Sequence, residues 1–448
     1  MAESLQVEIS YRQIGKIAAP IALALFVPQL NLITNSIFLG HHSEESLAEA
    51  AITGVYYLVF AGLGFGLNNG LQTLISRRAG ENRPEEIGKI FNQGVFIAFV
   101  VAAFGIITTQ LLTPPILRAF LNPEQANKAI DFLRIRIWGL PFLYVYQLRN
   151  ALLVGINQSR YLIIGTLAEA LANIFFDYTL IFGKLGFPTM GFNGAAVASI
   201  ISEFTGMIVI FWVISKKGIA QEFSLFRNFH FEKTTAGLIA KVSGPLAFQH
   251  AVSVLAWFFF YLLVARNASQ TGLAISTAMR TVFGFFGTCF WSLAATTNSM
   301  VSNVIGQGRR EEVIPLVWKI SKLGLGLAVL VCLILNLFPG LYLSLFRPNE
   351  SAFVIEGTPV LRLIGFVTLF LSIGTIWLNA VTGTGNSRVT FLVEVGAIIF
   401  YCIYVFVVLE VRHLSILWGW MSEVLYWTIL FSLSYYYMMS KRWKHTVI

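Results

Sequence analysis

Long apolar stretches, separated by short polar or glycine- and proline-containing breaks, recur along the whole sequence. About 20 consecutive apolar residues suffice for a helix to cross the hydrocarbon core of a bilayer. The pattern therefore predicts twelve membrane-spanning helices joined mostly by short loops. The predicted spans are 17–39, 50–76, 91–113, 132–154, 161–183, 194–215, 244–265, 273–302, 315–338, 358–381, 390–410 and 415–439.

Composition narrows the class of protein further. Of 448 residues, 56% are hydrophobic and only 12% are charged, against about 25% charged residues in soluble domains. This excludes a water-soluble globule and predicts an all-α, multi-pass membrane protein. The net charge of +9 does not indicate nucleic-acid binding, because the surplus basic residues lie in loops between apolar spans. Cys289, Cys332 and Cys402 lie inside apolar runs and are interpreted as packing residues.

Lysine and arginine are distributed unevenly between the two sets of alternating loops. The set that includes both termini carries 20 of the 31 basic residues, and the opposite set carries 6. Basic loops stay in the cytoplasm, so both termini are predicted to be cytoplasmic, in a bacterial plasma membrane. The polar start of the chain has no cleavable signal pattern, so the first span is expected to be retained.

The sequence repeats itself at a separation of 225 to 228 residues. IGKIAAP is followed by IAKVSGP, ISRRAGENRPEEI by VSNVIGQGRREEV, and GINQSR by GTGNSR, while Arg134 and Arg362 precede a third matching segment. Each half holds six spans, an even number, so the halves should cross the membrane in the same sense as a parallel pseudo-two-fold repeat. We expect a six-helix lobe at 1–215, a cytoplasmic linker at 216–243 and a second six-helix lobe at 244–448. Such duplications build secondary transporters.

The repeated loops, together with NSIFLGHHSEESLAEA and FFDYTLIFGKLGFPTMGFNGAAVASIISE, resemble the multidrug and toxic compound extrusion (MATE) family from Ile14 to about Tyr437. The resemblance implies a two-lobe antiporter that exports amphipathic, often cationic compounds against inward flow of Na⁺ or H⁺. The TLIFG and GFNGAAVAS segments favour the branch whose coupling site lies in the N-terminal lobe.

One polar stripe lies inside a predicted span. Glu169, Asn173 and Asp177 are four residues apart and therefore share one helix face. Ionisable groups at bilayer depth are costly and are candidates for function. Asp177, helped by the oxygen of Asn173, could bind Na⁺ or take up a proton. At an offset of 228 residues the second half has Ala397, Tyr401 and Val405, which favours ion handling in the N-terminal lobe alone.

The family resemblance adds partners for this stripe. It places Asn35 where the family has an aspartate on the first span, and Ser199 at a hydroxyl position on the sixth. Asn35 can offer an oxygen to Na⁺ but cannot titrate, which tilts the expected coupling ion toward Na⁺ and excludes a two-carboxylate proton site with this pair. The predicted Na⁺ ligands are Asp177, Asn173 and Asn35. A coupling carboxylate on the seventh span would fall at Ser253, so that site is expected to be absent.

Other polar residues within spans are candidates for lining a cavity or for helix packing: Glu203, Gln249, His250, Asn68 and Glu394. Pro20 and Pro28 each remove a backbone hydrogen bond from the first span, so we expect this helix to bend when the occupancy of Asp177 changes.

Three other classes of function were weighed. A lipid or lipid-linked saccharide flippase with the same two lobes is the alternative, although its cavity would need many basic residues. An enzyme is not expected, because no HExxH, GxSxG or paired-aspartate pattern is present. A passive channel is disfavoured by the two-fold repeat. We expect a monomer that needs no cofactor and acts on small amphipathic molecules.

Overall fold

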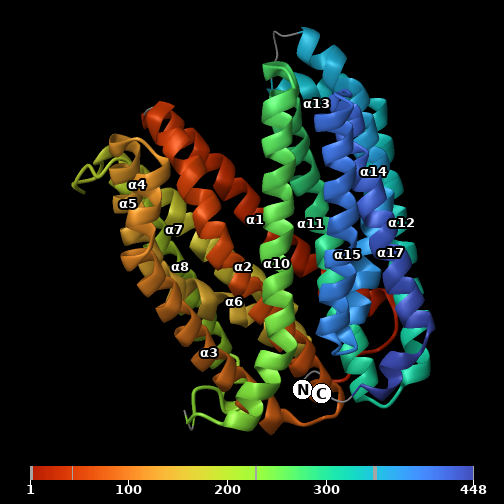
Figure 1. Cartoon of the computed structure of the whole chain (residues 1–448). Helices are drawn as coiled ribbons and strands as arrows, with labels where there is room; N and C mark the ends of the chain where they lie inside the picture. The colour runs from red at the N-terminus through yellow and green to blue at the C-terminus, as the bar shows by residue number, and fades with distance from the viewer. Residues whose placement is uncertain (1–3, 43, 228–229, 347–350, 447) are drawn as a thin grey trace. The chain divides into compact units, whose positions relative to one another are not determined.

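The computed structural model describes residues 4–42, 44–227, 230–346, 351–446 and 448. Within these residues every regular element is helical, as predicted (Figure 1). The chain forms two compact units, one made mainly of Ala19–Ala247 and the other of Gln6–Ala18 together with Phe248–Ile448.

Two long helices are shared between the units. α1 (Tyr11–His42) begins in the second unit and continues in the first, and α10 (Lys233–Asn267) begins in the first unit and continues in the second. The remaining elements of the first unit are α2 (Glu44–Gly80), α3 (Pro84–Leu111), α4 (Thr113–Phe120), α5 (Pro123–Arg136), η1 (Ile137–Gly139), α6 (Leu140–Gly155), η2 (Ser159–Tyr161), α7 (Leu162–Phe182), α8 (Phe192–Lys216) and α9 (Ile219–Glu222).

The second unit contains a corresponding series of elements. They are α11 (Gln270–Gly306), η3 (Arg310–Glu312), α12 (Val313–Leu337), α13 (Pro339–Phe346), α14 (Ser351–Gly383), α15 (Ser387–Val405), the π-helix η4 (Phe406–Val411), α16 (Ile416–Trp420), α17 (Ser422–Met439) and η5 (Arg442–His445).

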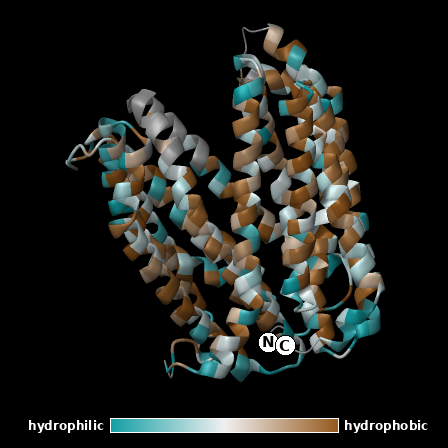
Figure 2. Ribbon diagram, viewed as in Figure 1, coloured by the Kyte–Doolittle hydropathy of each residue, from teal (hydrophilic) through white to brown (hydrophobic). Residues whose placement is uncertain are grey.

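Among the described residues, eleven helices are long and apolar enough to cross a membrane. Figure 2 shows hydrophobic residues along most of their length and hydrophilic residues concentrated near the loops. The predicted span at 132–154 is built differently, because a 3-10 turn, η1, separates the end of α5 from the 16-residue α6. Each predicted span therefore has a helical counterpart, and the fourth is a broken one.

The loop predicted at 114–130 is itself largely helical, since it contains α4 and most of α5. Local capping explains the start of α5: Pro123 occupies the first turn, and the Asn122 side chain accepts a hydrogen bond of 2.9 Å from the backbone N–H of Gln125. Both are signals for a helix N-terminus. In the same way, α13 lies within the loop predicted at 339–357.

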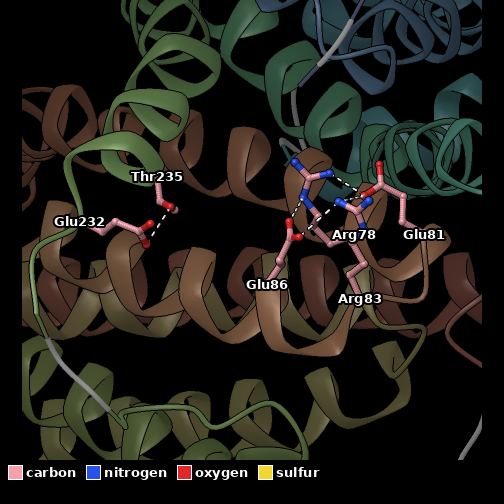
Figure 3. Close-up of polar contacts among 6 residues, drawn as sticks. All are labelled: Arg78, Glu81, Arg83, Glu86, Glu232 and Thr235. Carbon is pink, nitrogen blue, oxygen red and sulfur yellow. Dashed lines mark hydrogen bonds and ion pairs between the residues drawn. The ribbon is translucent and has the colours of Figure 1, made fainter.

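The first repeated loop folds into the same turn in both units. Asn82 and its equivalent Gly308 both adopt a left-handed backbone, with φ of 56° and 78°. Arg83 then pairs with Glu86 at 3.2 Å, and Arg309 pairs with Glu312 at 2.6 Å. Figure 3 shows how Arg78 adds further ion pairs in the first unit, to Glu81 at 2.6 Å and Glu86 at 2.8 Å.

A second pair of equivalent contacts lies near the opposite ends of the same helices. Gln110 on α3 donates to the backbone carbonyl of Arg134 at 2.9 Å. Asn336 on α12, 226 residues later, donates to the carbonyl of Arg362 at 3.4 Å. The sequence repeat is therefore also a repeat of side-chain contacts.

A third pair holds the segments that precede α10 and α1. Gln93 on α3 donates to the carbonyl of His230 at 2.6 Å and accepts from the backbone N–H of Glu232 at 3.2 Å. Its equivalent on α12, Lys319, donates to the carbonyl of Ile9 at 3.1 Å. Glu232 also accepts a hydrogen bond from Thr235 at 3.0 Å in the first turn of α10 (Figure 3).

Candidate functional site

The first unit brings Asn35 on α1 against Asn173 and Asp177 on α7. The Asn35 amide satisfies its surroundings when its nitrogen faces α7. Nδ2 then donates to Asn173 Oδ1 at 3.1 Å, to Asp177 Oδ2 at 2.5 Å and to the backbone carbonyl of Asn31 at 3.3 Å. Asp177 is fully buried, and Asn173 is 5% exposed. Three of the predicted residues thus lie together.

Two oxygen atoms near this trio have no hydrogen-bond partner in the described part of the chain. They are Oδ1 of Asp177 and Oδ1 of Asn31, which lies one turn before Asn35 on α1. A buried oxygen without a donor is costly in an apolar interior. Carboxylate and amide oxygens are the kind of ligand that hard cations prefer. Asp177 and Asn31 are therefore able to contribute oxygens to a bound Na⁺.

Glu169, the third member of the predicted stripe, belongs to a different polar group. Its carboxyl group hydrogen-bonds the Tyr146 hydroxyl and faces Arg149. Arg149 is buried, donates to Thr166 Oγ1 at 2.7 Å, and lies with its guanidinium carbon 3.3 Å from the centre of the Tyr146 ring. Glu169 therefore has a basic neighbour of its own, two helical turns away from Asp177.

Glu203 on α8 is held in a buried ion pair. Arg136, the last residue of α5, donates through Nη1 and Nη2 to its two carboxylate oxygens at 3.0 and 2.5 Å. The same guanidinium lies 3.8 Å from the centre of the Tyr57 ring. Glu203 is only 4% exposed, so this two-bonded pair positions α5 against α8 and leaves the carboxylate fully engaged.

The charges of the first unit are thereby divided unequally. Its buried ionisable set contains two arginines, Arg136 and Arg149, and three carboxylates, Glu169, Glu203 and Asp177. With all five ionised, the set carries one net negative charge. Asp177 is the carboxylate without an adjacent arginine side chain, so the arrangement can be neutralised there by one monovalent cation or one proton.

Two predicted residues in the first unit lie apart from these contacts. Ser199 on α8 accepts a hydrogen bond of 2.8 Å from Ser202 through its backbone carbonyl, and no contact between its hydroxyl and Asp177 is found in the described part of the chain. Asn68 on α2 is buried and donates to Asn69 at 3.4 Å. Pro20 and Pro28 both lie inside α1, which remains one continuous helix.

In the second unit, Gln249 belongs to a polar group around Glu394. Ser253, Tyr426 and Gln249 lie 2.7, 2.5 and 3.5 Å from the Glu394 carboxylate and donate hydrogen bonds to it. The sequence alignment at 228 residues shows no polar stripe on α15 corresponding to α7, yet tertiary folding assembles a buried carboxylate from α10, α15 and α17 instead. His250 is half-buried on α10, next to Gln249.

Sequence reasoning missed several residues of these groups. Asn31 lies four residues before Asn35, so the helical period could have found it. Arg136 and Arg149 are charges within predicted spans, which is itself a signal for a buried partner, but the sequence does not say which carboxylate each would meet. Glu423, which is 3% exposed on α17, had the same signal.

The helical repeat, the buried charges and the apolar spans define a polytopic membrane protein of the duplicated transporter class. The chain matches the MatE family over residues 20–179 and 245–407. It therefore belongs to the MatE family, and the expected family resemblance is confirmed.

Relatives and solved structures agree with this assignment. The chain is 26% identical over 445 residues to the probable multidrug resistance protein NorM of Thermotoga maritima, covering 98% of this chain and 94% of the relative. A crystal structure of MATE in complex with MaL6 superimposes with a TM-score of 0.90 at 19% identity and 99% coverage of both chains. A MOP superfamily transporter from Pyrococcus furiosus Vc1 gives a TM-score of 0.88 at 18% identity, covering 100% of this chain and 99% of that one. The two-lobe, all-α MATE fold is thus established, and the chain is a multidrug efflux transporter.

Proposed function

We propose that the protein is an antiporter that exports amphipathic, cationic small molecules in exchange for Na⁺, with Asp177 as the coupling residue. The observation that carries this proposal is the unpartnered Oδ1 of a fully buried carboxylate. An uncompensated charge in the membrane is expensive, so ion binding at Asp177 changes the stability of the first unit strongly.

The neighbouring oxygens favour Na⁺ over H⁺ as the coupling ion. Asp177 Oδ1 and Asn31 Oδ1 would supply protein ligands, and Asn173 and Asn35 would hold the other carboxylate oxygen and the helix α1 in register. Asn35 cannot carry a second exchangeable proton. A site with one carboxylate and several amides takes up a single positive charge.

The proposed cycle uses α1 as the moving element. Because Asn31 and Asn35 lie on α1 and Asp177 lies on α7, ion binding strengthens the α1–α7 contact, and ion release weakens it. The backbone hydrogen bonds missing at Pro20 and Pro28 make bending of α1 easier. Two arrangements of α1 would then correspond to two forms of the first unit with different affinity for the exported compound.

The experiment is transport by purified protein in proteoliposomes under separate Na⁺ and proton gradients. We expect an inward Na⁺ gradient to drive export by the wild-type protein, and Asp177→Asn to abolish this drive while the protein remains folded. Glu311→Gln, at an exposed carboxylate in η3, serves as the matched control and should behave as wild type.

A clear result would overturn the proposal. If Asp177→Asn retained full gradient-driven transport, coupling would not depend on this carboxylate. If only the proton gradient drove the wild-type protein, Asp177 would be a proton site and the role given to the amide oxygens would be wrong.

A further inference from the structure

The second unit contains a cavity of about 250 Å³ formed by α10, α15 and α17. Its lining includes Ser253 and Trp257 from α10, Tyr401 from α15, and Glu423 and Tyr426 from α17. Tyr401 and Glu423 are buried, whereas Ser253, Trp257 and Tyr426 are half-buried. The cavity therefore has a buried floor and a side that reaches the surface of the unit.

Glu423 turns an unsatisfied carboxylate oxygen toward this cavity. The residue is 3% exposed, and its Oε2 accepts a hydrogen bond of 3.0 Å from Trp427 Nε1. In the described part of the chain this is the only hydrogen bond to the carboxylate, and the cavity is lined by no lysine or arginine. A buried carboxylate in this position calls for a positively charged or hydrogen-donating occupant.

The neighbouring Glu394 makes the cavity more attractive to a cation. Ser253 and Tyr426 both donate their hydroxyl hydrogens to Glu394 Oε1, at 2.7 and 2.5 Å. A hydroxyl has one hydrogen and two lone pairs, so each of these oxygens can offer only lone pairs to the cavity. Glu394 is thus fully bonded itself and orients two acceptors beside Glu423.

Aromatic rings complete the wall. The rings of Tyr401 and Tyr426 lie 5.9 Å apart between centroids at an interplanar angle of 71°, and Trp257 lines the same space. Aromatic faces attract cations, and cages of this kind recognise alkylated ammonium groups. A small inorganic ion would require a shell of several hard oxygens, whereas here one carboxylate oxygen and two hydroxyls share the wall with three rings.

We propose that this cavity binds the ammonium head group of an organic cation, held by Glu423 and by the faces of Trp257, Tyr401 and Tyr426. The volume lies below the range of about 300–1,000 Å³ typical of whole drug-sized ligands, which fits a head group whose apolar remainder lies outside. The inference rests on the proposed export function and adds a substrate contact in the second unit, separate from Asp177 in the first.

The test is equilibrium binding of radiolabelled tetraethylammonium to the purified full-length protein in detergent. We expect Glu423→Gln to weaken binding at least tenfold, Trp257→Leu to weaken it severalfold, and the control Glu311→Gln to leave it unchanged. Size-exclusion chromatography and thermal unfolding of each variant establish that it is folded. Because Trp257 and Glu423 lie on different helices, either folded variant suffices to test the site.

The outcomes separate this inference from the coupling proposal. Asp177→Asn should lose ion-driven transport and keep tetraethylammonium binding, while Glu423→Gln should lose binding. Wild-type affinity in folded Glu423→Gln or Trp257→Leu protein would overturn the head-group site. Loss of ²²Na⁺ binding in Glu423→Gln, with tetraethylammonium binding intact, would also overturn it by showing an inorganic cation site, whatever the result for Asp177.

Discussion

Arg136 binds Glu203 through two hydrogen bonds of 3.0 and 2.5 Å inside the first unit. This pairing removes one buried carboxylate from any exchange with ions, and Arg149 lies beside a second, Glu169. The remaining carboxylate, Asp177, keeps an oxygen without a partner in the described residues. The contrast between an engaged and an open carboxylate underlies the predictions that follow.

Removing one member of the Arg136–Glu203 pair should destabilise the protein strongly. Glu203→Gln or Arg136→Met leaves the other charge buried without compensation, at a cost of about 3–5 kcal/mol. The double variant Arg136→Met, Glu203→Leu should recover most of this loss, because an apolar pair needs no counter-charge. Thermal unfolding in detergent measures all three. Equal destabilisation by the single and double variants would show that the pair does more than neutralise charge.

Asn31 should contribute to cation affinity although sequence reasoning did not select it. Its Oδ1 is buried and unpartnered near Asp177. We expect Asn31→Ala to raise the Na⁺ concentration for half-maximal transport about tenfold, which corresponds to about 1.4 kcal/mol, with little change at saturating Na⁺. Asn267→Ala, in the second unit, is the control for removal of an asparagine. An unchanged Na⁺ dependence would remove Asn31 from the ligand set.

The two prolines of α1 should matter for turnover more than for folding. Replacing Pro20 and Pro28 together by alanine restores backbone hydrogen-bonding capacity in α1 and disfavours bending. Export should slow severalfold, while binding of the exported compound and thermal stability are kept or improved. Rates in proteoliposomes, compared with binding in detergent, separate these effects. Transport at the wild-type rate would show that α1 need not bend.

Close helix packing in the first unit depends on Gly66 of α2. A Cβ atom at this position would lie 2.3 Å from the backbone N and Cα of Ala247 on α10. Because backbone atoms cannot move aside easily, Gly66→Ala should lower the unfolding temperature or prevent folding. Gly54→Ala on the same helix meets no atom within 4 Å and should stabilise by up to about 1 kcal/mol. Similar behaviour of the two variants would contradict the close approach of α2 and α10.

Much of the architecture follows from one-dimensional information. Apolar runs longer than a bilayer is thick can be buried in only one way, as helices, because backbone polar groups find no partners in lipid. The twelve spans and the two-fold repeat could therefore be predicted, and the repeat reappears in equivalent turns at Asn82 and Gly308. The amphipathic helices α4 and α13 were missed, because short helices outside apolar runs depend on local caps and packing.

The sequence by itself also determined that Asn173 and Asp177 share a helix face, since the helical period decides this locally. Only the tertiary structure decided which partner each buried charge acquired: Arg136 for Glu203, Tyr146 and Arg149 for Glu169, Asn35 for Asp177, and Ser253 with Tyr426 for Glu394. These pairings join helices far apart in the chain, and they depend on how the helices rotate and pack. Hydrophobic periodicity places residues on the faces of a helix but does not encode which face of another helix they meet.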